Sequence, residues 1–179
     1  SSQLTERFVA AWQASHPDTS VVSRDLAVEP VPHLDGARVT AFFSKPEERN
    51  AEQQAVVDFS DALIAELRQA DTVVIGLPMY NFGVPSTLKA YFDHIARSGV
   101  TFQYTAEGPK GLLTGKKAYI LAARGGRYAG TAKDSQTTYV RDFLGFIGIT
   151  EVEFVYAEGL NMVAEAAAQG DRSENAEYT

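Results

Sequence analysis

Two short segments of the chain combine the residue types best suited to chemistry. Residues 78–85 read Pro-Met-Tyr-Asn-Phe-Gly-Val-Pro, which joins aromatic side chains and one amide to residues that break regular structure. Residues 124–128 read Arg-Gly-Gly-Arg-Tyr, and the two glycines let the backbone approach a ligand closely. Aromatic surface with backbone N–H donors suits a flat ring system that takes up negative charge.

Both segments follow stretches typical of buried parallel strands. Residues 72–77 and 118–123 are continuous apolar runs bounded by turn residues. Ligands of open α/β sheets bind beyond the carboxyl ends of the strands, so we expect the two segments to reach one ligand. A flavin ring would fit such a site. The residues equally fit ordinary strand-to-helix connections in which Tyr80 and Phe82 close the core.

The rest of the chain alternates between helical and strand-like patterns. Helices are expected around residues 4–12 and over 47–69, 86–97, 136–146 and 164–169, and strands around 21–22, 100–104 and 152–156. The segment around Pro30 and Pro32 is expected to hold little regular structure. This alternation predicts the α/β class, with one parallel sheet covered by helices on both faces, in a single domain spanning residues 1–179.

Composition excludes several classes of function. The 179-residue chain has a net charge of −7 and no basic cluster, which argues against nucleic acid as a partner. It has no Cys, and its 3 His residues lack metal-ligand spacing, so neither a thiolate nor a metal site is expected. No apolar run reaches the ~18 residues of a membrane helix. The polar start lacks a signal-peptide core, so we expect a cytoplasmic protein without membrane partners.

Four groups of motifs occur in order along nearly the whole chain. They are Pro-Met-Tyr-Asn-Phe at 78–82 with Pro-Ser-x-Leu-Lys-Ala-Tyr-Phe-Asp at 85–93, Gly-Val-Thr-Phe-x-Tyr at 99–104 with Gly-Pro-x-Gly-Leu at 108–112, Arg-Gly-Gly at 124–126, and Phe-Leu-Gly-Phe-Ile-Gly-Ile at 143–149. Together they make the chain resemble the FMN-dependent NADH:azoreductases and NAD(P)H:quinone oxidoreductases. The resemblance implies a flavodoxin-like doubly wound fold, FMN as cofactor, and NADH or NADPH as co-substrate.

The resemblance also implies a set of site residues. Those expected to bind FMN are Ser1, Met79, Tyr80, Asn81, Phe82, Ala123, Arg124, Gly125 and Gly126. The first loop contacts the isoalloxazine ring and residues 123–126 hold its pyrimidine end, although many members have Ser in place of Ala123. Tyr104, Tyr128 and Phe146 are expected to line the substrate pocket, with Tyr104 reaching the partner subunit of a homodimer. Tyr104 and Phe146 also fit plain hairpin or core aromatics.

The implied activity is a two-step, ping-pong transfer in which NAD(P)H reduces the flavin and leaves before a quinone or azo compound is reduced. The flavin carries this chemistry, so no catalytic side chain is expected. One alternative is a flavodoxin-type electron carrier without NADH turnover, which the acidic charge would fit but the aromatic loop at 80–82 opposes. Another is a flavin-free structural or interaction domain.

The start of the chain departs from the family pattern. In the flavodoxin-like strand order 2-1-3-4-5, the first strand lies inside the sheet and feeds the phosphate-binding loop. This sequence opens instead on a helix cap, and only Ser1 can represent the end of the family's Ser-x-Ser phosphate segment. Ser1 or Ser2 also fits a plain helix cap. We therefore expect the sheet to lack its first strand and the natural protein to extend upstream.

Overall fold

The computed structural model describes residues 1–162, so the helix expected over 164–169 lies outside the described part. The elements in chain order are α1 (Ser2–Ser15), α2 (Gly36–Phe43), the short 3-10 helix η1 (Pro46–Glu48), α3 (Ala51–Gln69), β1 (Thr72–Pro78), α4 (Ser86–Ile95), β2 (Phe102–Thr105), β3 (Gly108–Gly111), β4 (Lys117–Ala123), α5 (Ser135–Ile147) and β5 (Glu151–Ala157). Within residues 1–162, no helix is both long and apolar enough to span a membrane.

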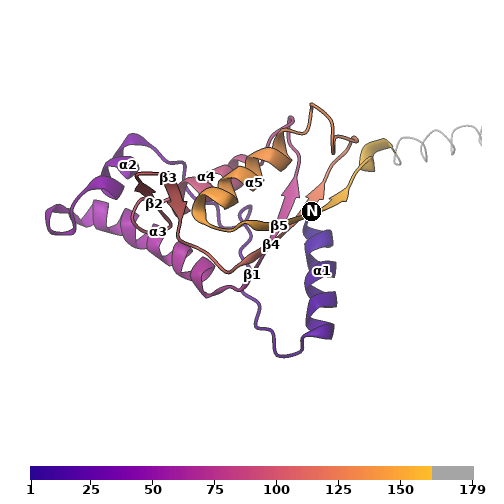
Figure 1. Ribbon diagram of the computed structural model, residues 1–179, viewed down its shortest axis with the longest axis horizontal. Helices are drawn as coiled ribbons and strands as arrows, with labels where there is room; N and C mark the ends of the chain where they lie inside the picture. Colours follow the sequence, from indigo (N-terminus) through magenta and orange to yellow (C-terminus); the bar gives the residue numbers. More distant parts are fainter. Residues whose placement is uncertain (163–179) are drawn as a thin grey trace, which may run out of the picture.

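The centre of the molecule is a parallel sheet of three strands in the order β1-β4-β5. In Figure 1, α1 lies below this sheet and α5 lies above it. The two central apolar runs form β1 and β4 as expected, and Ile75 pairs with Ile120 in their register. The class is therefore α/β with helices on both faces of a parallel sheet, as the alternating pattern predicts.

The main core lies between the sheet and the face covered by α3, α4 and α5. Helix α3 buries Val57, Ser60, Leu63, Ile64 and Leu67, which recur at helical spacing. Phe92 of α4 stacks on Phe143 of α5 with ring centroids 4.0 Å apart. These contacts fix the N-terminus of α5 relative to the sheet, which matters for the site described below.

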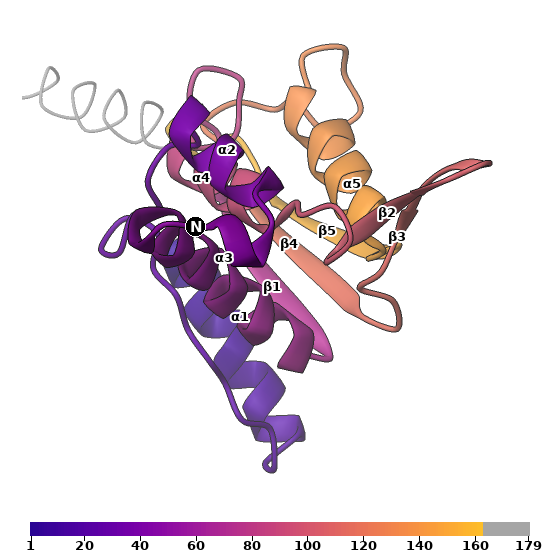
Figure 2. The same ribbon diagram turned by 90° about the vertical axis from the view of Figure 1, so that its left-hand side faces the viewer.

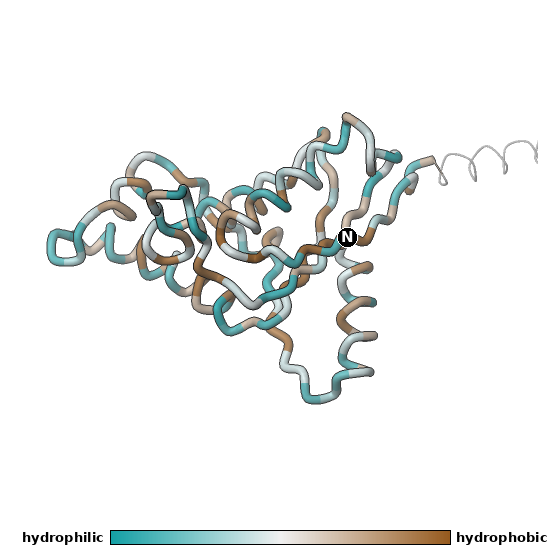
Figure 3. Tube along the Cα trace, viewed as in Figure 1, coloured by the Kyte–Doolittle hydropathy of each residue, from teal (hydrophilic) through white to brown (hydrophobic). Residues whose placement is uncertain are grey.

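The opposite face of the sheet is covered by α1. Hydrophobic and polar residues alternate along this helix in Figure 3, as in an amphipathic helix. Phe8 packs against Tyr119 of β4 at 4.9 Å between ring centroids. Gly76 permits the close approach of α1, because a Cβ there would lie 2.6 Å from Thr5 Oγ1 and 3.6 Å from Ser1 Cβ. The N-terminus of α1 therefore sits against the C-terminal half of β1.

One expectation about the region before α3 is wrong, and one helix there was not expected. Residues 19–25 form no strand, and Val21 and Val22 are 46% and 75% exposed. A strand needs a neighbour for its backbone groups, and β1 is at the edge of the described sheet. The helix that was not expected is α2, which closely follows the Pro-rich segment. Its N-terminus is stabilised because the Asp35 carboxylate accepts a hydrogen bond from Arg38 N and caps the helix.

Candidate active site

The two candidate loops leave neighbouring strands at the same edge of the sheet. Pro78 at the end of β1 pairs with Ala123 at the end of β4. The first loop continues this pairing for one more bond, because Met79 N donates to Ala123 O at 3.2 Å. The expectation that both loops reach one place is therefore confirmed, and that place lies at the carboxyl ends of the strands.

The first loop contains a tight turn from Tyr80 to Gly83. Tyr80 N donates to Gly83 O at 3.1 Å and Gly83 N donates to Tyr80 O at 2.9 Å. Between them, Asn81 and Phe82 have φ angles of 48° and 65°, as in a type I′ turn. The turn presents its aromatic side chains outwards, since Tyr80 is 62% exposed and Phe82 is 54% exposed. The interpretation in which these rings close the core is therefore wrong.

The second loop brings two glycines and an aromatic ring beside the first. A Cβ on Gly126 would lie 2.8 Å from the Tyr128 ring, and one on Gly125 would lie 2.5 Å from Asn161 Nδ2, so a side chain at either position would displace a neighbouring side chain. Among residues 1–162, neither glycine N–H donates a hydrogen bond. The Tyr128 ring meets the Phe82 ring edge-on with centroids 5.7 Å apart. The loops therefore share one wall of aromatic rings.

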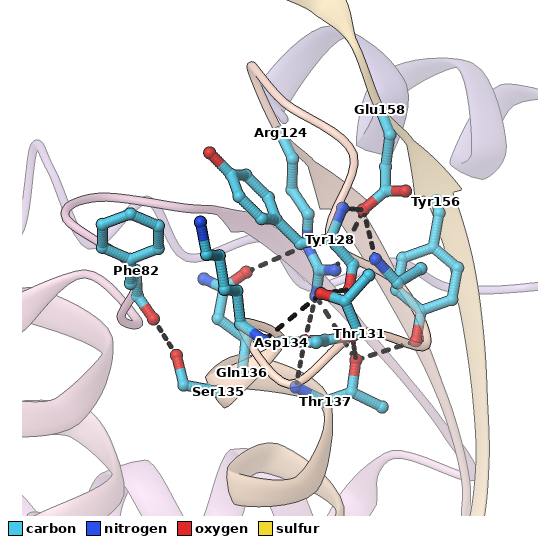
Figure 4. Close-up of polar contacts among 12 residues, drawn as sticks. Phe82, Arg124, Tyr128, Thr131, Asp134, Ser135, Gln136, Thr137, Tyr156 and Glu158 are labelled. Carbon is cyan, nitrogen blue, oxygen red and sulfur yellow. Dashed lines mark hydrogen bonds and ion pairs between the residues drawn. The ribbon is translucent and has the colours of Figure 1, made fainter.

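Arg124 occupies a buried position between the loops and α5 (Figure 4). Its side chain is 0% exposed, and it forms ion pairs with Asp134 at 2.9 Å and with Glu158 at 3.1 Å. Its Nε donates to Gln136 Oε1 at 3.2 Å. The guanidinium is thus satisfied inside the protein. The sequence expectation placed Arg124 against a ligand, whereas its side chain here ties protein segments together.

Two carboxylates surround this single guanidinium. Burial alone raises the pKa of Asp134, but hydrogen bonds from Arg124 and Thr137 outweigh it and hold the pKa below its ordinary value. Burial opposes ionisation of Glu158 as well, and hydrogen bonds from the N–H groups of Tyr128 and Ala129 and from Arg124 lower its pKa. Both carboxylates are therefore ionised at neutral pH, and the cluster carries one net negative charge.

This cluster predicts a loss of stability in acid. Folding lowers the pKa of both carboxyl groups, so they stabilise the folded state fully at pH values above their unfolded-state pKa of about 4. This stabilisation is lost as the pH falls through the lower folded-state pKa. We expect the free energy of unfolding, measured with urea, to fall steeply below about pH 4. The Asp134→Asn variant should show a shallower fall over the same range, and a slope equal to that of the wild type would contradict the assignment.

Gln136 and Ser135, at the start of α5, hold the first loop. Gln136 Nε2 donates to Pro78 O and to Gly83 O, both at 2.9 Å. Ser135 Oγ donates to Phe82 O. Neither residue was expected at the site from the sequence, and nor were Asp134 and Glu158. Glu158 could have been found, because it directly follows the carboxyl end of β5, where ligand-site residues gather.

The three expected pocket residues fall into two separate clusters. Tyr128 belongs to the loop wall just described. Phe146 of α5 packs instead against Phe102 of the β2–β3 hairpin, with centroids 4.2 Å apart. Tyr104 meets the same Phe102 ring edge-on at 5.5 Å, and its own side chain is 73% exposed. Figure 2 shows the tip of this hairpin projecting from the rest of the molecule.

Ser1 lies at the N-terminus of α1 but does not cap it through its side chain. The residue occupies the N-cap position without a side-chain capping hydrogen bond, and Ser2 is the first residue of the helix. The Thr5 hydroxyl donates to Ser1 O at 3.2 Å. The expected helix cap is therefore Ser1 by position and not Ser2, although the Ser1 hydroxyl makes no hydrogen bond within residues 1–162.

The sequence model of the flavodoxin-like fold matches residues 1–179. The chain belongs to this flavodoxin-like family. An FMN-dependent NADH:quinone oxidoreductase of Cellvibrio japonicus is 60% identical over 162 residues, which cover 90% of this chain and 81% of that protein. Another, from Alcanivorax borkumensis, is 56% identical over 177 residues, covering 97% and 89%.

Solved structures agree with the flavodoxin-like assignment. A Bacillus anthracis azoreductase superposes with a TM-score of 0.84 at 34% identity, covering 93% of this chain and 83% of that one. A second, an FMN-dependent NADH-azoreductase from the same species in complex with FMN, gives a TM-score of 0.76 at 26% identity, covering 89% and 79%. The flavodoxin-like fold of this chain is thus shared with proteins of known structure.

Proposed function

We propose that this flavodoxin-like protein is an FMN-dependent NADH:quinone oxidoreductase. The observation that carries the proposal is the pair of loops at the carboxyl ends of β1 and β4, with outward-facing aromatic rings on one and unused glycine N–H groups on the other. The names of the quinone oxidoreductases at 60% and 56% identity support it. When bound, FMN would accept a hydride from NADH and return two electrons to an acceptor.

The residues present fit FMN. The Met79–Phe82 loop would lie against the isoalloxazine ring, and the N–H groups of Gly125 and Gly126 would face the pyrimidine end, next to Ala123. A Cβ at Gly125 would collide with the Asn161 side chain, and one at Gly126 with the Tyr128 ring. Arg124 would support this loop from beneath. The N-terminus of α1, with Ser1, would face the phosphate, because helix N-termini favour anions.

We further propose that NADH or NADPH and the acceptor use the same place in turn. Tyr128 adjoins the loop wall, and Tyr104 and Phe146 would complete the pocket in a dimer. Quinones and azo compounds are both flat and apolar, which suits a wall of aromatic rings. Initial rates over a grid of NADH and quinone concentrations should give parallel double-reciprocal lines. Intersecting lines would show that both substrates bind together and would overturn the ping-pong order.

The Asn81→Ala variant is expected to bind FMN more weakly and to be reduced more slowly by NADH. Asn81 is exposed and its amide makes no hydrogen bond within the described residues, so it is free to contact the ring. Losing one such bond costs about 1 kcal/mol, or roughly fivefold in the dissociation constant. Fluorescence titration of FMN measures this. Asn81→Gly is the matched control, because it keeps the positive φ but lacks the amide, and wild-type affinity in both variants would remove Asn81 from the site.

The protein is also expected to be a homodimer with a site at each end of the interface. Tyr104 is 73% exposed on a projecting hairpin, and the Tyr104–Phe146 cluster makes no aromatic contact with the loop wall of its own chain in the described residues. An exposed aromatic hairpin of this kind is typical of an interaction surface. Sedimentation velocity at micromolar concentration should therefore show a dimer. A fully active monomer would contradict this expectation.

A further inference from the structure

We propose that Gln136 and Arg124 are positioning residues that hold the Tyr80–Gly83 turn in its ligand-binding shape and couple it to the loop after β4. This inference rests on the proposed function, because it assigns the two residues a role toward FMN. Neither side chain is directed at a ligand: Gln136 is 0% exposed and Arg124 is 1% exposed. Their effect on the reaction would be transmitted through the backbone of the loops.

The turn needs an external support because its backbone is strained. Asn81 and Phe82 both have positive φ angles, 48° and 65°. Asn tolerates this region well, but a bulky residue such as Phe occupies it only when the surroundings impose it. In type I′ turns the second of these positions usually belongs to Gly. The shape that turns the Phe82 ring outwards is therefore imposed by contacts from elsewhere in the fold.

Gln136 supplies the central contacts. Its Nε2 donates to Pro78 O before the turn and to Gly83 O at its end, each at 2.9 Å. One amide group thus bridges the two sides of the loop. Ser135, the preceding residue, donates to Phe82 O at the tip. The first turn of α5 thus binds the carbonyl oxygens of Pro78, Phe82 and Gly83, and Phe143 further along the same helix stacks on Phe92 in the core.

Arg124 fixes the orientation of the Gln136 amide. Arg124 Nε donates to Gln136 Oε1 at 3.2 Å, so the amide oxygen must face the guanidinium. A flipped amide would place its NH2 group against a cation and its oxygen against two carbonyl oxygens. The donor side of Gln136 therefore always faces the loop. This makes Arg124 part of the support of a turn that it does not itself touch.

Arg124 also links the support to the second loop. Its Nη1 donates to Glu158 Oε1 at 3.1 Å, and the same oxygen accepts the N–H groups of Tyr128 and Ala129, both at 2.9 Å. Figure 4 shows this continuous path from Phe82 and Ser135 through Gln136 and Arg124 to Glu158. Because the central Arg124–Gln136 hydrogen bond is buried and hydrogen bonds continue from it to both loops, the two loops are held in one fixed relation. A ligand that spans both loops would meet donors at set positions.

Two substitutions separate the parts of this support. Gln136→Leu removes both the donor and the acceptor side. Gln136→Glu is nearly isosteric and keeps an acceptor for Arg124, but it replaces the donor side with a carboxylate oxygen facing Pro78 O and Gly83 O. Gln69→Leu is the control, because Gln69 is exposed at the end of α3. The first measurement is hydrogen exchange at the amides of Tyr80 and Gly83 in the FMN-free protein.

We expect exchange at these two amides to become about tenfold faster or more in both Gln136 variants, and to stay unchanged in the control. The second measurement is made at saturating FMN, where the visible circular dichroism of the flavin should change and its midpoint potential should fall. Gln136→Glu should give the lower potential of the two, since it adds negative charge near the reduced ring. A residue with only a structural role would change stability but leave these flavin signals at their wild-type values.

Wild-type exchange at Tyr80 and Gly83 in either folded variant would overturn the inference. So would a normal flavin spectrum and potential in variants whose turn has loosened. Loss of folding in both variants would also count against it, because positioning requires that the fold survive without the support. If the wild type fails to bind FMN, the proposed function fails, while hydrogen exchange still decides whether Gln136 holds the turn.

Discussion

Replacing Arg124 with methionine is expected to lower the free energy of unfolding by about 3–5 kcal/mol. The guanidinium is 0% exposed, and its removal leaves Asp134 and Glu158, 7% and 16% exposed, without their cation. Leaving buried carboxylates uncompensated is among the most costly single changes in a protein. Urea unfolding of the FMN-free protein at neutral pH measures the loss directly, apart from any effect on the cofactor.

A second arginine provides the matched control for this prediction. Arg141 lies on α5, is exposed, and donates to Val152 O at 3.2 Å. Arg141→Met should therefore cost no more than about 1 kcal/mol. The Arg124→Met variant should also bind FMN weakly, because Gln136 and Glu158 lose their common partner. A variant within about 0.5 kcal/mol of the wild type would mean that the buried cluster contributes little to the fold.

Gly111→Ala is expected to be the most damaging small substitution, with a loss of about 3 kcal/mol or more. A Cβ on Gly111 would lie 2.1 Å from Gly148 N and 2.4 Å from Gly148 Cα. These are backbone atoms of the residue that ends α5 with a φ of 108°, so no side chain can move aside. The hairpin would have to separate from α5, which would displace Tyr104 and weaken the proposed dimer as well.

Gly145→Ala is the control, because Gly145 lies within α5 and a Cβ there would meet nothing within 4 Å. In a helix interior this change should be neutral or stabilise by up to about 1 kcal/mol. Thermal unfolding and sedimentation of the two variants make the comparison. A Gly111→Ala protein that melts with the wild type would show that the hairpin does not pack against the end of α5 as described.

Local pattern predicted the elements that carry the site. The runs at 72–77 and 118–123 became β1 and β4 because strands buried on both faces are apolar throughout. Their loops met because parallel strands end at one edge. Residues 21–22 failed as a strand because pairing depends on a neighbour elsewhere in the chain. Helix α2 was overlooked because the prolines before it hid the Asp35 cap.

The interior of the site was less predictable, because its contacts join distant parts of the chain. The family resemblance assigned Arg124 to a ligand, but the position of its side chain depends on Glu158, 34 residues away. Gln136 reads as an ordinary residue near the start of a helix, and only the packing of α5 brings it to Pro78 and Gly83. The expected ligand contacts of residues 79–82 and 123–126 stay predictions.

Adding NADH to the purified, FMN-loaded protein in the absence of oxygen tests the proposed oxidoreductase activity most directly. The yellow colour should bleach rapidly with stoichiometric NADH and return when a quinone is added. A flavin that binds and keeps its colour with NADH would contradict the proposed activity and indicate an electron carrier. Failure to bind added FMN would contradict both the cofactor and the activity, and would indicate a flavin-free domain.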